Sequence, residues 1–196
     1  MKKVVLATVL SSLISVNAFA VDTFVGVSFG QTDMSNEWVD AALDELGKAN
    51  IAVSTEDDSA FAIQAGVNSY INNFLEIQSY IEYKDFGTSK VTPIGHGTIS
   101  LDHSGVQAIV MPKIVFNGFY AGAKVGGGYL MQEMTALDES KSDSGMAITT
   151  GLEFGYKFKK VIFKAGYDKT SYVQETTGKD YDVDLGVTYA GINYNF

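Results

Sequence analysis

The sequence predicts an all-β protein: eight antiparallel strands form an up-and-down barrel that crosses a membrane, with a short helix in the first long connection. Three observations support this prediction. The chain begins with a segment typical of exported proteins. Apolar residues then alternate with polar or small ones in eight segments, and the connections between these segments alternate between short and long.

The first twenty residues have the pattern of a secretory signal peptide. Lys2 and Lys3 give a positive start, residues 4–16 are largely apolar, and residues 18–20 form an A-x-A cleavage site. The apolar run is too short to span about 30 Å of hydrocarbon as a helix. We therefore expect residues 1–20 to be removed and residues 21–196 to form one exported barrel domain.

The composition excludes several classes of protein. Acidic residues number 23 against 14 lysines, arginine is absent and the net charge is −9, whereas nucleic-acid binding needs a basic face. The absence of cysteine excludes disulfides, thiolate metal sites and a cysteine nucleophile, and only two histidines are present. We expect no enzymatic activity, no cofactor, no metal site and no nucleic-acid partner.

The two-residue repeat defines the expected strands. It occurs at about residues 25–30, 61–68, 75–84, 105–111, 119–129, 146–158, 161–168 and 183–189. In 105–111 both parities are apolar, so the facing of this strand stays open. Phe119 and Tyr129 share a face and lie about 33 Å apart along the strand. At the tilt of a membrane barrel this spans about 25 Å, the height of an apolar band between two aromatic girdles.

The connections indicate which end of the barrel is which. Short connections fall near residues 70–73, 113–117 and 159–160, and long ones near 32–58, 88–104, 132–143 and 172–181. In outer-membrane barrels the short turns are periplasmic and the long loops external. Lysines lie at the short turns (Lys113, Lys157, Lys159 and Lys160), whereas most acids lie in the long connections. We expect a basic periplasmic rim and an acidic outer surface.

The polar row of the strands is expected to face a narrow lumen. It carries charges of both signs, at Glu76, Glu82, Lys84, Lys124, Glu153, Lys164 and Asp184. Because isolated charges are costly in a water-poor interior, Lys124 and Lys164 should lie near Glu76, Glu82, Glu153 or Asp184. A soluble periplasmic ligand-binding barrel stays open as an alternative, because there the same row would face water.

The end of the chain carries the most specific motif. Ile192, Tyr194 and Phe196 alternate up to a terminal phenylalanine, which resembles the assembly signal of bacterial outer-membrane barrels. Along residues 21–196 the chain resembles the small eight-stranded barrels of the OmpA-transmembrane, OmpX and opacity-protein type. The resemblance implies residence in the outer membrane and contact with its lipids, with lipopolysaccharide and with the barrel assembly machinery. It also implies a non-enzymatic role in surface interaction, adhesion or envelope integrity.

The last strand contains a conflict of parity. Its first apolar residues, from Val183 to Tyr189, are odd-numbered, whereas Ile192, Tyr194 and Phe196 are even-numbered. A bulge would restore one lipid-facing row, and the small pair Ala190–Gly191 is the predicted place for it. Alternatively, residues 183–189 project beyond the bilayer and no bulge is needed.

Two long connections hold further candidates. In the first, Trp38, Val39, Leu43 and Leu46 fall on one face of a predicted helix, which either covers the barrel mouth or presents a surface to a host or cell-surface partner. In the second, the sequence Asp102-His103-Ser104 raises the alternative of a lipid-modifying outer-membrane enzyme. In a strand, however, the side chain of His103 would point away from both neighbours.

Overall fold

The computed structural model describes residues 21–36, 51–52, 58–93, 99–136, 139–176 and 179–196. The expected signal peptide and the expected helix around Trp38 lie outside the described residues. The strands are β1 (Val21–Asn36), β2 (Ile51–Ala52), β3 (Asp58–Tyr70), β4 (Leu75–Pro93), β5 (Ile99–Phe116), β6 (Phe119–Ala136), β7 (Glu139–Phe158), β8 (Val161–Thr176) and β9 (Lys179–Asn195). In these ranges no helix is long and apolar enough to cross a membrane.

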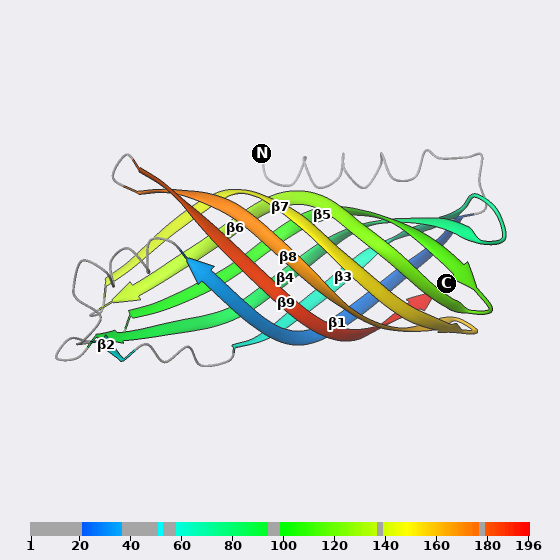
Figure 1. Cartoon of the computed structure of the whole chain (residues 1–196), viewed down its shortest axis with the longest axis horizontal. Coiled ribbons are helices and arrows are strands. Elements are labelled where there is room, and N and C mark those ends of the chain that lie inside the picture. The colour runs from blue at the N-terminus through cyan, green and yellow to red at the C-terminus, as the bar shows by residue number, and fades with distance from the viewer. Residues whose placement is uncertain (1–20, 37–50, 53–57, 94–98, 137–138, 177–178) are drawn as a thin grey trace.

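Eight of the strands form a closed antiparallel barrel. Each pairs with its neighbours in the chain, and β1 pairs with β9 from Phe24↔Asn195 to Asn36↔Val183, which closes the ring. The two-residue strand β2 adds to β4 outside this ring. Figure 1 shows the strands tilted across a long barrel, with the short turns and the C-terminus at one end and the other ends of the strands, such as the C-terminal end of β1, opposite. We call these the short-turn end and the loop end.

The tight turns follow from the residues that form them. Asn117 and Gly118 connect β5 to β6 with φ of 50° and 85°, the left-handed pair that suits a two-residue hairpin. Lys159, with φ of 56°, begins the turn from β7 to β8. Between β3 and β4, the Asn72 side chain accepts hydrogen bonds from the backbone N–H groups of Phe74 and Leu75. These three connections hold neighbouring strands in register at the short-turn end.

The predicted bulge in the last strand is wrong. β9 pairs with β1 and β8 in regular register through Tyr189, Ala190, Gly191 and Ile192. Its odd-numbered residues face the lumen from Val183 to Asn195, because the lumen at the level of Val183, Leu185 and Val187 contains apolar side chains. The register shift lies instead in β4, where Phe86 is inserted and points inward.

Side chains alternate between the lumen and the outer face along the barrel strands. This alternation also settles the facing of β5, which the sequence left open. Leu101, His103, Gln107, Ile109 and Met111 are buried in the lumen, whereas the residues between them face outward.

Candidate functional site: a filled lumen and an acidic rim

The outer face carries a belt of exposed apolar side chains. Ile148 is 66% exposed and Leu152 is 56% exposed, although both would be core residues in a soluble protein. Aromatic residues border the belt. On the loop side lie Tyr83, Tyr129 and Tyr167, and toward the short turns lie Phe74, Phe116, Phe119, Tyr156, Phe158, Tyr194 and Phe196. This arrangement matches a lipid-facing band between two aromatic girdles and excludes the soluble-barrel alternative.

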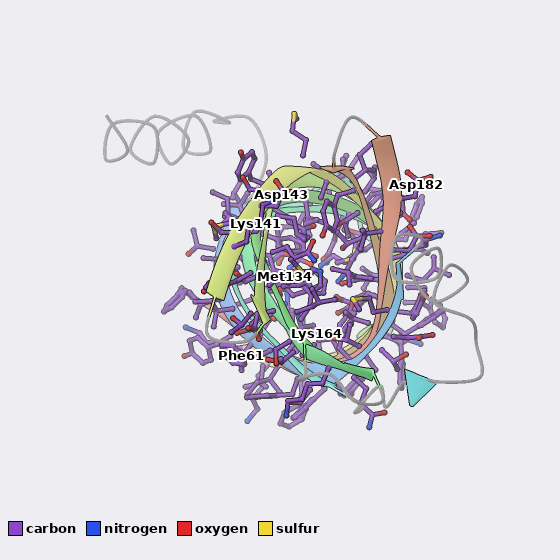
Figure 2. All side chains as sticks on the ribbon, turned by 90° about the vertical axis from the view of Figure 1, so that its left-hand side faces the viewer. Phe61, Met134, Lys141, Asp143, Lys164 and Asp182 are labelled. Atoms are coloured by element: carbon purple, nitrogen blue, oxygen red, sulfur yellow. The ribbon has the colours of Figure 1, made fainter. Side chains whose placement is uncertain are left out.

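Five of the charges predicted for the lumen form one buried cluster. Lys84 Nζ lies 2.9 Å from Glu82 and 2.7 Å from Asp168. Lys124 Nζ lies 3.2 Å from both Glu153 and Asp168, and Lys164 Nζ lies 3.9 Å from Glu153. We call Glu82, Lys84, Lys124, Glu153, Lys164 and Asp168 the central charge cluster. Figure 2, seen from the loop end, shows side chains crowding the ring of strands, with Lys164 within it.

Asp168 belongs to this cluster although the sequence analysis did not select it. It lies on the same parity of β8 as Lys164, and its side chain is 1% exposed. The pattern therefore contained the signal for this residue. What the sequence did not contain was the pairing across the lumen, because Lys84 and Lys124 come from strands that do not neighbour β8.

Tyrosines add hydrogen bonds to Glu153 in the central charge cluster. The hydroxyl groups of Tyr120 and Tyr189 donate hydrogen bonds to Glu153, at 2.6 Å and 2.9 Å. The Tyr189 ring lies 4.3 Å from Lys124 Nζ, within range of a cation–π contact. The cluster thus combines three lysines, three carboxylates and two phenols in one buried network.

A second lumen ion pair lies nearer the short-turn end. Lys113 Nζ is 3.2 Å from Glu76 and donates a hydrogen bond to Asn68 at 3.1 Å. The sequence analysis placed Lys113 on the periplasmic rim, but the structure buries its side chain inside the barrel because β5 continues to Phe116. The rim retains Lys157, Lys159 and Lys160.

Asp184 is not a lumen residue. It lies on the outer face of β9, where it pairs with Lys169 at 2.8 Å and accepts a hydrogen bond from Ser171. The prediction assumed a polar lumen along the whole strand. The lumen is apolar at this level, so the even-numbered residues of β9 face outward there.

Apolar side chains cluster in the loop-end half of the lumen, beside buried polar ones such as His103 and Gln132. These apolar residues come from six strands and are at most 6% exposed. We call them the apolar plug: Ala60, Phe86, Leu130, Ala147, Tyr172, Val183, Leu185, Val187 and Tyr189. Together with the central charge cluster, the apolar plug occupies the interior of the barrel. An eight-stranded barrel is just narrow enough for its own side chains to fill.

The rim at the loop end is acidic. The described strand ends there (31–36, 58–59, 85–93, 99–104, 131–136, 139–146, 169–176 and 179–188) contain 11 acidic residues and only 4 lysines. On one side of this rim, a recess of about 530 Å³ is lined by Asp85, Asp102, Glu133 and Asp143 together with serine and threonine hydroxyls. Asp102 and Glu133 are directly opposed on β5 and β6.

The Asp-His-Ser sequence does not form a catalytic relay. The side chain of His103 points into the lumen, where it is 2% exposed and packs against the Tyr172 ring at 6.3 Å. Asp102 and Ser104 lie on the opposite parity of β5. Nucleophilic catalysis needs the three side chains within hydrogen-bond reach of one another, which alternation along a strand prevents.

The residues of the expected assembly signal lie at the closure of the barrel. Ile192, Tyr194 and Phe196 project from the outer face of β9. The Tyr194 and Phe196 rings pack edge to face at 5.4 Å, and the Phe196 N–H donates a hydrogen bond to the Thr23 carbonyl. The terminal motif thus lies at the lipid-facing seam between β9 and β1.

Comparison with known proteins gives the same fold. No protein-family model and no curated protein matches the sequence. Among solved structures, the Neisserial surface protein A is 13% identical, with a TM-score of 0.58 over 90% of this chain and 99% of that chain. Ail, the attachment invasion locus protein of Yersinia pestis, is 14% identical, with a TM-score of 0.52 over 89% of this chain and 98% of that chain. A further structure holds Ail in complex with the heparin analogue sucrose octasulfate.

The fold is that of a small outer-membrane β-barrel. The predicted eight-stranded up-and-down architecture is confirmed, and the lipid-facing belt agrees with it. In outer-membrane barrels the short turns are periplasmic and the long loops are external.

Proposed function

We propose that the protein resides in the outer membrane, has no enzymatic activity, and acts through its loop end in attachment to another surface. The observation that supports this proposal is the filled lumen: the residues of the apolar plug and of the central charge cluster are at most 6% exposed. A barrel that carries no solute can still present its external end. The acidic rim is the chemically distinctive part of that end among the described residues.

The charge of the rim defines the partner. The Ail structure holds a sulfated, anionic ligand. The loop end of this chain has a large excess of carboxylates, which repel polyanions. We therefore propose a basic protein surface as the partner, with attachment that weakens as salt screens the charges. The first long connection, with Trp38, Val39, Leu43 and Leu46 on its predicted helix, would add an apolar contact area.

Binding by the purified barrel in lipid nanodiscs tests this proposal. We expect it to bind an immobilised lysine-rich peptide at low salt and not to bind immobilised heparin. The triple variant Asp102→Asn, Glu133→Gln and Asp143→Asn should bind the peptide several-fold more weakly. Asp22→Asn, at the short-turn end, is the matched control and should bind normally. Heparin binding, or equal peptide binding by the triple variant, would contradict the proposed partner.

Two further measurements separate the other roles. In planar bilayers, the wild-type protein should give no discrete conductance steps, because the lumen is filled. Lipid A from cells that produce the protein should keep its mass; a mass shift that disappears in His103→Ala would show a lipid-modifying enzyme instead. If a deletion strain becomes sensitive to detergent and the triple variant restores resistance, the role is envelope integrity rather than attachment.

The other proposed partners follow from the belt and the C-terminal strand. The apolar belt contacts membrane lipids, and lipopolysaccharide surrounds the loop end. The lipid-facing motif of Ile192, Tyr194 and Phe196 is available to the barrel assembly machinery before β9 pairs with β1. Replacement of Phe196 by alanine should reduce the amount of heat-modifiable barrel in the outer membrane more than it changes the stability of the folded protein.

A further inference from the structure

One part of the lipid-facing belt is concave. A groove of about 930 Å³ crosses the outer wall formed by β9, β1, β3 and β4. Its volume lies within the range of sites that bind small organic ligands, about 300–1,000 Å³. The polar residues named among its lining, such as Gln64 and Asn193, have buried side chains that point into the lumen, so they contribute backbone to the groove.

The concavity arises from small outward side chains between large ones. Val25 and Ala65 are paired across β1 and β3, and they form the floor. Tyr194 of β9 and Ile81 of β4 extend the same cross-strand row on either side.

The groove reaches the short-turn end of the belt. Phe196 and Val161 line its part nearest the short turns. The floor residues Val25 and Ala65 lie about five residues from the short-turn ends of their strands. At about 3.3 Å per residue and a tilt near 40°, this depth is roughly half of the hydrocarbon band. An acyl chain that enters from the periplasmic leaflet would reach the floor.

Positive charge lies at the entrance. Lys160 immediately precedes Val161, and its Nζ lies 5.8 Å from the Tyr194 ring. The Lys160 carbonyl accepts a hydrogen bond from the Asn195 N–H, which fixes the turn beside the end of β9. Lys159, in the same turn, is exposed. A lysine ammonium at headgroup level attracts the phosphate of an anionic lipid.

We propose that this groove binds one phospholipid of the periplasmic leaflet, with its acyl chains over Val25 and Ala65 and its anionic headgroup at Lys159 and Lys160. The charge at the entrance and the depth of the floor both favour a phospholipid over lipopolysaccharide, whose headgroups meet the acidic loop end. The site depends on the membrane location proposed above. It is independent of what the loop end binds.

Native mass spectrometry of the barrel from nanodiscs of phosphatidylethanolamine and phosphatidylglycerol tests the site. We expect the wild-type protein to retain one phosphatidylglycerol. Ala65→Phe fills the floor and should reduce retention about ten-fold, whereas Lys160→Gln should reduce it several-fold and leave the groove open. Ala123→Phe, on an exposed outward position of β6 outside the groove, is the matched control and should retain the lipid.

Each other outcome overturns the proposal. Equal loss in Ala65→Phe and Ala123→Phe would show an unspecific effect of bulk. Preferential retention of lipopolysaccharide from nanodiscs that also contain it, or a dimer mass that Ala65→Phe abolishes, would assign the groove to a different occupant. Because Lys160→Gln leaves the groove residues unchanged, it tests the site even if Ala65→Phe fails to give a heat-modifiable barrel. Failure of the membrane location would appear separately, as the absence of heat-modifiable barrel from the membrane fraction for all variants.

Discussion

The two halves of the lumen are filled by opposite chemistry. Toward the loop end, the apolar plug packs leucine, valine and aromatic side chains at almost zero exposure. In the middle of the barrel, lysines and carboxylates pair with one another and with tyrosine hydroxyls. The same narrow interior is therefore closed in two ways, by packing in one half and by neutralised charge in the other. The difference predicts that mutations act through cavities in the plug and through unpaired charge in the cluster.

The largest effect is expected at the centre of the charge cluster. Glu153 accepts hydrogen bonds from Tyr120 and Tyr189 and pairs with Lys124 and Lys164. Glu153→Gln leaves the two buried lysines with one carboxylate fewer, and loss of one partner from a buried pair costs about 3–5 kcal/mol. Urea unfolding in phospholipid vesicles, followed by the heat-modifiable band on a gel, measures this loss.

A matched variant separates the effect of leaving buried lysines without a partner from the effect of losing one negative charge. Glu133→Gln removes a carboxylate from the exposed rim and should change the free energy of unfolding by less than about 0.5 kcal/mol. If the two variants unfold at the same urea concentration, the central cluster contributes no more than the rim does. The two halves of the lumen would then differ in composition but not in how mutations destabilise them.

The sequence predicted the barrel and the charged half of the lumen for a clear reason. A two-residue repeat is local, so it could be read along each strand, and it placed Glu82, Lys84, Lys124, Glu153 and Lys164 on the polar row. The apolar half was missed because one parity was taken as polar throughout. Val183, Leu185 and Val187 were therefore assigned to lipid and Asp184 to the lumen, opposite to where they lie. A single sequence does not show at which height along the barrel the lumen changes from charged to apolar.

The second prediction tests packing in the apolar plug. Leu185 is 1% exposed and contacts other members of the plug. Leu185→Ala leaves a cavity and should cost about 2–4 kcal/mol. Leu152→Ala removes the same atoms from the lipid-facing wall, where lipid can fill the space, and should cost less than half as much. The same urea experiment measures both variants, and equal losses would show that the plug is loosely packed.

The third prediction tests how tightly the side chains pack in the charged half of the lumen. A Cβ atom on Gly155 would lie 2.4 Å from the Tyr120 ring and 2.5 Å from the Phe163 carbonyl. Gly155→Ala must therefore displace the ring that donates to Glu153, and overpacking of this kind costs about 1–3 kcal/mol. Gly127 faces outward, and its nearest contact for a Cβ is 3.4 Å. Gly127→Ala should be neutral or stabilise by about 0.4–1 kcal/mol, because it restricts the unfolded chain.

The smallest effect is expected where charge is not buried at all. Asp184 and Lys169 pair on the outer face, beyond the girdle residue Tyr167, and are exposed to solvent. Hydrogen bonds from Lys169 and Ser171 hold the pKa of Asp184 below that of a free aspartate. Because the folded-state pKa is the lower one, the pair stabilises the fold at neutral pH and this contribution is lost as the pH falls through the folded-state pKa.

Asp184→Asn should therefore lower the urea midpoint slightly at neutral pH and by less in acid, and added salt should remove the difference. Lys164 provides the comparison, because its partner Glu153 is buried with it and salt cannot screen the pair. The stability lost in Lys164→Met should be insensitive to salt. Equal salt dependence of the two variants would show that water and ions reach the centre of the lumen. The lumen would then not be filled, and the proposed function would lose the observation that supports it.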